Sequence, residues 1–507
     1  MKKIFTLLSA LVLFPVLLVQ GQSPVPAFIS DSLDSYIQRG MQDWEIPGMS
    51  LAIVKDGQVV LSKGYGVRDL LTQKPVDDKT LFYIASNTKL FTGTAVAKLY
   101  YEGSLKMDEK VSTYLPWFSL YDKNSTELVS VRDILSHRLG TQTFQGDFTF
   151  WGTTLTREQV VRKMALLKPS APFRQNFGYC NAGYAAAGLV IEQVSGKKWE
   201  AYVRDNFLTP LGMYDTYLTS SDAVSRPNIA TPYSTSFTPL QAIPYDEVDA
   251  IGPAGNMLSC AQDMAKWLQL QLDSGRYNGK RILDWGAVYE TRKGNTVVNT
   301  RKSGYAPQHF SLYGLGLFSG DYNGRQIYWH TGGAFGFVSV TCFVPEENLG
   351  LVILTNQDNQ SFFEALRYQV LDAYLDMPYV DRSAFFLNFH RQSQLKTAQT
   401  LEEYRRRVDA KPALPVPLKG ITGTYKHFLY DFIEIREENN ELLVHFGLHK
   451  NLEAKLEYMG GNEFLLSYNN PGYGMHPVKA LFKGKKMISI EVKAPDFLEY
   501  DPYTFTR

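Results

Sequence analysis

Four consecutive residues, Ser86-Asn87-Thr88-Lys89, have the types and spacing of an activated serine nucleophile. They precede an apolar, helix-forming run that ends near Leu99. A serine in the first turn of a helix lies near unpaired N–H groups, and a lysine three residues on shares its face. Burial there would lower the pKa of Lys89 and make it a base for the Ser86 hydroxyl. The same residue types also cap ordinary surface helices, so the pattern needs support from elsewhere.

A second group of candidates is Tyr179-Cys180-Asn181, in a glycine-punctuated turn ahead of a small-residue helix predicted over residues 185–194. Loops held by rigid elements carry catalytic groups, so the tyrosine and the asparagine are candidates for chemistry. Cys180 could be mistaken for a nucleophile, but no histidine lies close to it in the sequence. We therefore expect it to be a small buried side chain.

The third group is His330-Thr331-Gly332-Gly333, which follows an aromatic, strand-like run at residues 326–329. Glycines inside a strand pattern indicate the close approach of a ligand or of another backbone. With an unperturbed pKa near about 6.5, His330 would be only partly charged at neutral pH. The alternative is an ordinary hydrogen-bonded histidine at the end of a strand.

Taken in chain order, the motifs Ser-x-x-Lys, Tyr-x-Asn and His-Thr-Gly resemble the serine β-lactamase-related hydrolases of the class C and peptidase S12 branch. The resemblance is closest to D-stereospecific serine peptidases with a C-terminal lipocalin-like domain, and it covers about residues 30–375. The flanking segments that agree with it are residues 50–60, 134–137, 211–213 and 255–259. A motif set of this kind predicts chemistry that the geometry of the site must support.

The resemblance implies a role for each matching residue. Ser86 would attack an acyl carbonyl and become an acyl-enzyme. Lys89 and Tyr179 would share the proton transfers, the phenol having a pKa lowered by neighbouring positive charge. Asn181 would orient Lys89 and the substrate amide. The backbone N–H groups of Ser86 and Gly333 would form the oxyanion hole.

One departure from the family pattern concerns the substrate. His330 stands where β-lactamases and penicillin-binding enzymes usually carry lysine, and a mostly neutral imidazole would be a weak, pH-dependent anchor for a carboxylate. Peptides, amides or esters are therefore favoured over penicillins. Thr331 and Gly332, next to His330, are expected to contact the substrate.

A second departure lies at residues 136–141, where related enzymes commonly read His-Thr-Ser-Gly, and it makes Arg138 a candidate for shaping the pocket. The following stretch, residues 144–152, is unusually aromatic. Within it, Gln145 could hydrogen-bond a substrate amide, and the aromatic rings could hold an apolar side chain. The rings can equally serve only to pack this loop onto the body of the protein.

The N-terminus has the layout of a secretory signal peptide over residues 1–22, because two lysines precede an apolar stretch at residues 4–19. We expect a periplasmic or secreted protein without a stable membrane anchor. The 52 basic and 51 acidic residues leave a net charge of +1, which gives no electrostatic reason to bind nucleic acid. Three cysteines form no disulfide framework, and no histidine or cysteine spacing suggests a metal or other cofactor.

The expected fold is α+β, with the site between two parts of one domain. Residues 23–378 would form a β-lactamase/transpeptidase-like domain, an antiparallel sheet flanked by helices plus an all-helical part. Residues 379–417 would be a helical and proline-rich linker. Short alternating runs in residues 418–507 predict a small antiparallel β-barrel, which resembles the lipocalin-like domain and implies a possible homo-oligomer. The barrel strands are expected at residues 432–436, 442–446, 464–468 and 487–492.

The function that these features favour is an exported serine hydrolase of short peptides or amides, with the preference for D-residues implied by the resemblance. An esterase on the same scaffold is the alternative. A β-lactamase or a non-catalytic, penicillin-binding-like sensor is a further possibility. Intact Ser86, Lys89 and Tyr179 argue against the sensor, because a binder has no need of a base beside the hydroxyl.

Overall fold

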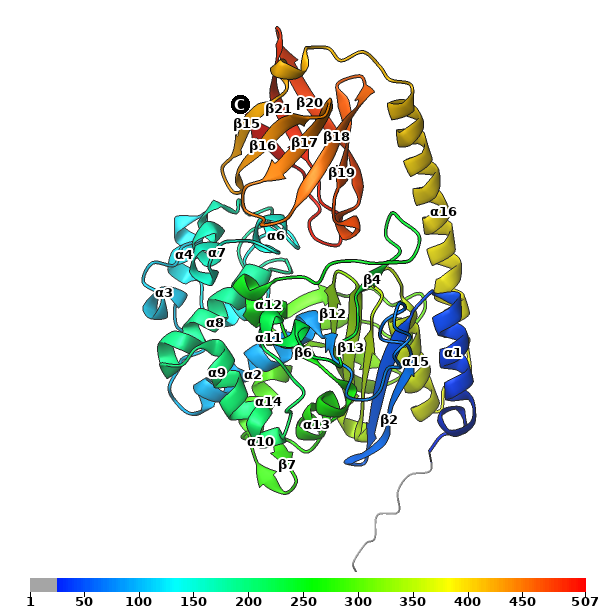
Figure 1. Cartoon of the computed structure of the whole chain (residues 1–507). Helices are drawn as coiled ribbons and strands as arrows, with labels where there is room; N and C mark the ends of the chain where they lie inside the picture. Colours follow the sequence, from blue (N-terminus) through cyan, green and yellow to red (C-terminus); the bar gives the residue numbers. More distant parts are fainter. Residues whose placement is uncertain (1–24) are drawn as a thin grey trace, which may run out of the picture.

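The computed structural model describes residues 25–507, so the signal peptide predicted over residues 1–22 lies outside the described residues. The described chain folds into a large α+β domain, with a closed β-barrel above it and a long helix joining the two (Figure 1). Within residues 25–507, no helix combines the length and the apolar character that a membrane crossing requires.

The large domain is built on an eight-stranded antiparallel sheet in the order β2-β1-β14-β13-β12-β11-β10-β9. Its central strands β13 (Phe337–Val344) and β14 (Leu349–Thr355) are buried along their whole length, because helices cover both faces. The predicted hairpin at residues 50–60 is β1 (Gly48–Lys55) and β2 (Gln58–Gly66). The other strands are β9 (Thr296–Asn299), β10 (Ser311–Tyr313), β11 (Phe318–Tyr322) and β12 (Arg325–Ala334).

Helices α1 (Leu33–Asp43) and α15 (Phe362–Tyr374) cover one face of the sheet, and α2 (Thr88–Tyr101) and α13 (Ala261–Leu272) cover the other. The buried residues of α1 recur at helical spacing, which is the pattern of a helix with one apolar face. The remaining helices are α3 (Val111–Tyr114), α4 (Lys123–Leu128), α5 (Val131–Leu135), α6 (Asp147–Phe150), α7 (Arg157–Lys163), α8 (Asn181–Ser195), α9 (Trp199–Val203), α10 (Thr209–Leu211), α11 (Ser220–Val224), α12 (Gly252–Gly255) and α14 (Trp285–Arg292). Short strand pairs are β3 (Phe82–Tyr83) with β6 (Leu258–Ser259), β4 (Tyr233–Ser234) with β5 (Gln241–Ala242), and β7 (Arg276–Tyr277) with β8 (Lys280–Arg281).

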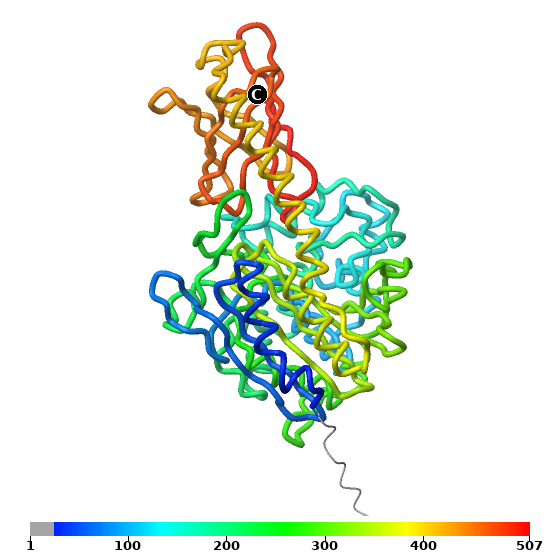
Figure 2. Tube along the Cα trace, turned by 90° about the vertical axis from the view of Figure 1, so that its right-hand side faces the viewer, coloured from blue at the N-terminus to red at the C-terminus, as the bar shows by residue number. Residues whose placement is uncertain are grey.

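The helix predicted around residues 383–408 is α16 (Arg382–Asp409), which starts beside α15 and rises along one side of the molecule to the barrel (Figures 1 and 2). Near its end, Arg405 pairs with Glu457 at 2.6 Å and Arg407 with Glu463 at 2.7 Å. Partly exposed pairs of this kind add little stability, so their effect is mainly to orient the barrel on the helix.

The C-terminal domain is a closed antiparallel barrel of eight strands, in which β22 returns to pair with β15. The four strands expected from the sequence are all present, and on β17 buried side chains alternate with exposed or partly exposed ones, as a barrel requires. The α+β class and the C-terminal antiparallel barrel are therefore confirmed. The strands are β15 (Gly423–His427), β16 (Asp431–Glu438), β17 (Glu441–Phe446), β18 (Glu453–Gly460), β19 (Glu463–Tyr468), β20 (Met475–Lys483), β21 (Lys486–Val492) and β22 (Tyr503–Thr506).

Candidate active site

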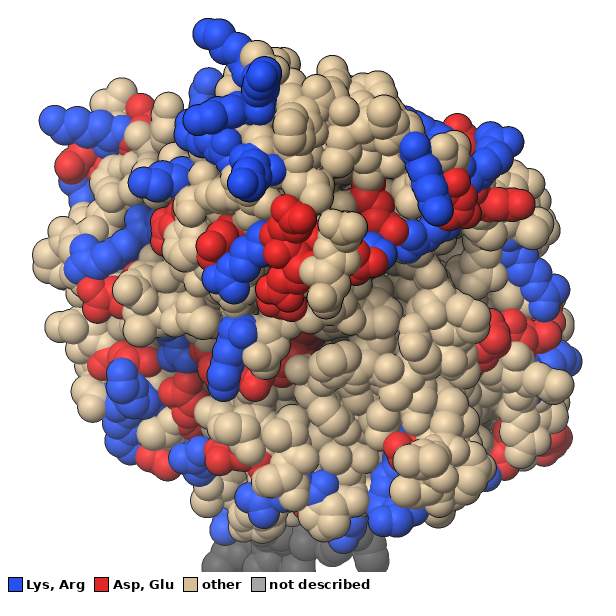
Figure 3. Space-filling view, turned by 45° about the horizontal axis from the view of Figure 1, so that its top comes forward, with Lys and Arg blue, Asp and Glu red and all other residues tan. Residues whose placement is uncertain are grey.

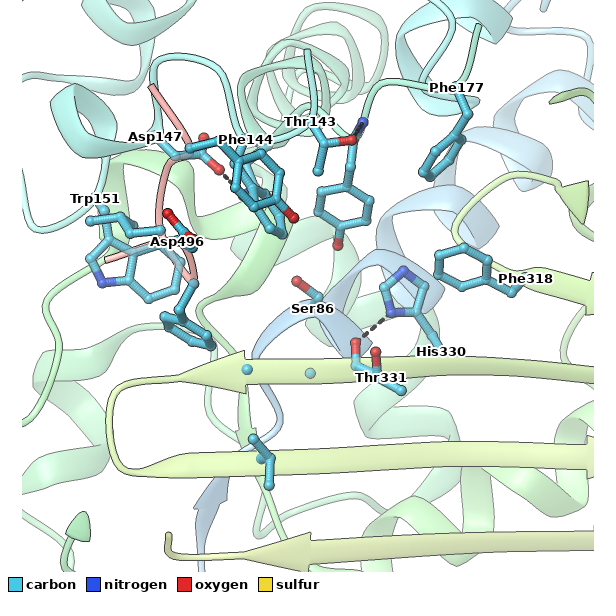
Figure 4. Close-up of a pocket in the computed structure, with 18 of the residues that line it drawn as sticks. Ser86, Thr143, Phe144, Asp147, Trp151, Phe177, Phe318, His330, Thr331 and Asp496 are labelled. Carbon is cyan, nitrogen blue, oxygen red and sulfur yellow. Dashed lines mark hydrogen bonds between the residues drawn. The ribbon is translucent and has the colours of Figure 1, made fainter. Parts of the chain in front are cut away.

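Ser86 lies in a single 3₁₀ turn, Ala85–Asn87, immediately before α2. The preceding residue, Ala85, has a φ of +46°, a left-handed conformation that is costly for a residue with a Cβ atom. The side chain of Asn87 braces the turn, because its amide donates to Ser339 Oγ at 2.9 Å. The turn thus presents the Ser86 hydroxyl to an open cavity, where His330 and Thr331 lie beside it (Figure 4).

Lys89 lies three residues after Ser86, in the first turn of α2, and is completely buried. Its Nζ lies 3.1 Å from Ser86 Oγ, 2.7 Å from Asn181 Oδ1 and 2.7 Å from the carbonyl oxygen of Ala254. Burial lowers the pKa of Lys89 to about 7, and the charge of Asp147 opposes this shift. A neutral amine can donate to the two oxygens and accept the Ser86 proton with its lone pair, so this geometry suits a general base.

Tyr179 lies over the lysine, with the Lys89 Nζ 4.6 Å from the centre of its ring. We expected nearby positive charge to lower the pKa of this phenol, and that expectation is wrong. Burial raises the pKa of Tyr179 well above its usual value, and a hydrogen bond to Ser86 opposes the rise only in part. The phenol is therefore protonated at neutral pH, which leaves Lys89 as the candidate base and Tyr179 as a group that can donate a proton beside the serine.

Asn181 opens α8 and connects Lys89 to an acid that the sequence reasoning missed. Its Oδ1 accepts from Lys89, while its Nδ2 donates to Asp147 Oδ2 at 2.7 Å. Burial, and then the charge of Glu499, raise the pKa of Asp147 well above its usual value. The signal that could have found Asp147 is an acidic residue within the aromatic stretch at residues 144–152.

His330 sits on β12 and is buried. Its Nδ1 lies 2.6 Å from the carbonyl oxygen of Thr331, so that nitrogen carries the proton, and its Nε2 accepts from the Tyr313 hydroxyl at 3.0 Å. Burial, and then the charge of Lys89, lower the pKa of His330 to about 3. The partial charge predicted at neutral pH is therefore wrong, and the imidazole is neutral.

The glycines after His330 let β12 pass directly against the turn that carries the serine. A Cβ atom on Gly332 would lie 2.0 Å from the carbonyl oxygen of Ile84, which only a glycine at this position avoids. Gly333, Thr331 and Ser86 all line the cavity. The assignment of the Ser86 and Gly333 N–H groups to an oxyanion hole stays a prediction, and the course of β12 is compatible with it.

Two residues predicted to shape the pocket do not line it. The Gln145 side chain accepts from the backbone of Gln142 at 3.2 Å and donates to the carbonyl oxygen of Lys168 at 2.9 Å, so it ties its own loop together. The prediction that the Gln145 side chain contacts the substrate therefore disagrees with the structure. Arg138 instead pairs with buried Asp133 at 2.5 Å.

The cavity in front of Ser86 has a volume of about 470 Å³ and is rich in aromatic side chains. Of the aromatic loop, Phe144 and Trp151 line it, whereas Phe148 and Phe150 are buried in packing, so both readings of that loop apply to different residues. The barrel supplies part of the wall. The residues beyond the three motifs that line the cavity are Thr143, Phe144, Asp147, Trp151, Phe177, Phe318, Val338, Phe363, Asp496, Phe497, Leu498 and Tyr500.

A sequence model of the Beta-lactamase family matches residues 33–375, more than half of the chain, and the chain belongs to this family. Proteins with the fold of this family are typically serine hydrolases. The contact between the buried Lys89 and the Ser86 hydroxyl agrees with that class.

Its relatives include hydrolases and a penicillin-binding protein homologue. The protein named Unguisins hydrolase ungD' of Aspergillus campestris is 29% identical over 439 residues, which span 80% of this chain and 78% of that protein. Protein flp of Staphylococcus aureus is 26% identical over 336 residues, 65% of this chain and 63% of that protein. The octameric penicillin-binding protein homologue from Pyrococcus abyssi matches with a TM-score of 0.60 and 22% identity over 94% of this chain and 100% of that chain. This likeness concerns the fold, and its coverage takes in most of the barrel.

Proposed function

We propose that this protein hydrolyses short peptides or amides through an acyl-enzyme formed on Ser86. The observation that carries the proposal is the contact of 3.1 Å between Ser86 Oγ and Lys89 Nζ, at a lysine whose pKa burial lowers to about 7. Lys89 takes the hydroxyl proton as the serine attacks an acyl carbonyl. The protonated Tyr179 phenol beside the serine then gives its proton to the leaving group. The protonated amine of Lys89 gives a proton back to the phenol, which restores both groups.

The lining of the cavity supports a substrate without a free carboxylate near the reacting carbonyl. Among its lining residues in the described chain there is no arginine or lysine, and His330 is neutral. A carboxylate such as that of a penicillin would therefore lose its hydration without gaining a cationic partner. The rings of Phe144, Phe177 and Phe318 favour an apolar or aromatic side chain on the substrate.

Three finer parts of the proposal come from the resemblance and from the N-terminal sequence. We propose a preference for D-residues on the acyl side, export guided by residues 1–22, and assembly of several copies through the barrel domain.

Figure 3 shows basic and acidic side chains interspersed on the face that carries the barrel, beside a broad uncharged area. This distribution of charge fits a small neutral substrate better than a polyanion.

The test is to incubate the mature protein with matched D- and L-aminoacyl amides, a simple aryl ester and a penicillin, and to follow products and protein mass by mass spectrometry. Hydrolysis of a D-aminoacyl amide that is lost in Ser86→Ala supports the proposal. Turnover of the ester alone would replace it with an esterase. A stable penicillin adduct without turnover of any probe would replace it with a non-catalytic sensor.

The rate of acylation should rise with pH and level off above neutrality. Because the neutral amine of Lys89 is the base and its pKa is lowered to about 7, the active form is about a tenth of the total at pH 6 and about nine tenths at pH 8. The measurement is kcat/KM between pH 5 and pH 9 with an uncharged substrate. A profile that is flat over this range would contradict the assignment of Lys89 as the base.

A further inference from the structure

A buried carboxylate of the barrel domain, Glu499, reaches into the large domain and holds the segment that carries Asp147. Its Oε1 accepts from the backbone N–H of Gly146 at 2.7 Å, and its Oε2 accepts from the N–H of Phe148 at 2.9 Å. The Tyr503 hydroxyl donates to the same Oε2 at 2.8 Å. Glu499 is 3% exposed, so these bonds are shielded from water. The two backbone groups that it binds flank Asp147 on either side.

Residues of the barrel also contact the rest of this segment. The ring of Phe148 stacks on Tyr430 with ring centres 5.2 Å apart, and it also contacts other aromatic rings at the near end of the barrel. Thr149 Oγ1 lies 3.1 Å from the Tyr503 hydroxyl, and His449 Nε2 donates to the carbonyl oxygen of Trp151 at 2.8 Å. The barrel thus helps to fix the position of α6, although α6 belongs to the large domain and also packs on α8.

Asp147 is the residue of this segment whose side chain turns toward the catalytic groups. Its Oδ2 receives the Asn181 amide at 2.7 Å, the Asn181 Oδ1 receives Lys89 at 2.7 Å, and Lys89 contacts Ser86 at 3.1 Å. Every link in this chain is a direct hydrogen bond; the two at Asn181 are buried, and the one at Ser86 lies at the wall of the cavity. A shift of α6 would therefore reorient the Asn181 amide and, with it, the lone pair of Lys89.

Burying two acids so close together costs stability, and one of them, Glu499, forms the contact between the domains. Burial raises the pKa of Glu499 to about 7, and burial, followed by the charge of Glu499, raises the pKa of Asp147 well above its usual value. An apolar contact would hold the domains together without this cost. Groups that cost stability in this way are concentrated at functional sites.

We propose that Glu499 is a positioning residue for the catalytic lysine. By holding both sides of Asp147, the barrel keeps the Asn181 amide oriented so that Lys89 Nζ is aimed at Ser86. Glu499 does this without touching the substrate, and the barrel is a working part of the active site. This inference rests on the proposed function, because it assigns a task to the reaction of Ser86.

The test uses the full-length mature protein and a fluorophosphonate probe, which phosphonylates an activated serine with loss of fluoride and needs no knowledge of the substrate. The labelling rate of Ser86 is followed by mass spectrometry in wild type, Glu499→Gln, Asp147→Asn and the double variant. We expect each single variant to label on the order of tenfold more slowly, since a glutamine cannot accept from both N–H groups, and misplacement of a catalytic group costs rate. The double variant should be no slower than the slower single variant, because both act through one chain of contacts.

The matched control is Glu438→Gln, the same change at an exposed acid of the barrel strand β16, which should label at the wild-type rate. Wild-type labelling in Glu499→Gln, or additive losses in the double variant, would overturn the inference while leaving the proposed function intact. No labelling of Ser86 in wild type would overturn the proposed function itself. Where Glu499→Gln fails to fold by circular dichroism, Tyr503→Phe removes one donor to Glu499 and should slow labelling in the same direction.

Discussion

Replacing Lys89 with methionine is expected to slow acylation of Ser86 by about 10³-fold, within the range that a general base contributes. Methionine keeps most of the length of the side chain and fills the same buried space, so the fold is retained. The loss arises because, within residues 25–507, Lys89 is the amine in contact with the Ser86 hydroxyl, and the protonated phenol of Tyr179 cannot take its proton. The measurement is the burst of first product from an activated ester, compared at pH 8.

The control for this variant is Lys98→Met on the same helix. Lys98 pairs with Glu102 at the surface of α2 and lies outside the cavity. Loss of such a pair costs a few tenths of a kcal/mol at most, and the burst should be unchanged. Retention of more than a tenth of the wild-type rate by Lys89→Met would show that another group is the base.

The largest loss of stability is expected for Phe148→Ala. The ring is 1% exposed and lies among barrel aromatics, stacked on Tyr430 and on His449 with ring centres 5.2 and 5.4 Å away, and edge-on to Tyr503 at 5.5 Å. Deleting a buried phenylalanine costs about 3–5 kcal/mol through lost transfer energy and the cavity that remains. Calorimetry should show that the barrel unfolds at a lower temperature than in wild type, because the Phe148 ring joins the barrel to the large domain.

The control for the packing prediction is Phe428→Ala, a barrel phenylalanine that is 67% exposed. It should cost no more than about 0.5 kcal/mol, the usual range for a surface change. Equal effects of the two substitutions on the unfolding transition would refute the view that Phe148 anchors the barrel. A loss of Ser86 labelling in Phe148→Ala alone would agree with the task assigned to Glu499.

The architecture could be predicted from the sequence because it is encoded by local patterns. The helix predicted over residues 185–194 lies within α8, and the strands around residues 432–436 and 442–446 were visible as alternating runs between turns. Side-chain periodicity, caps and turn residues act over a few positions along the chain. Such patterns specify helices, strands and turns independently of the rest of the fold.

The charge states of the site could not be predicted in the same way. The charge of His330 was predicted from its unperturbed pKa and the pKa of Tyr179 from neighbouring positive charge, and both predictions were wrong. What decides the pKa of each group is burial, to which elements as distant as β10 and α8 contribute. Gln145 was predicted to contact the substrate and Asp147 was missed for a related reason, since the sequence does not show in which direction either side chain points.

The sequence by itself determined which residues can react: the order and spacing of Ser86, Lys89, Tyr179 and Asn181 place a hydroxyl, an amine, a phenol and an amide in a family of serine hydrolases. Only the tertiary structure decided how they are held. Glu499 lies 353 residues after Gly146 in the chain, yet it bonds that N–H. Neither residue carries a local signal of the contact, because a hydrogen bond between distant segments exists only once both domains are folded and packed.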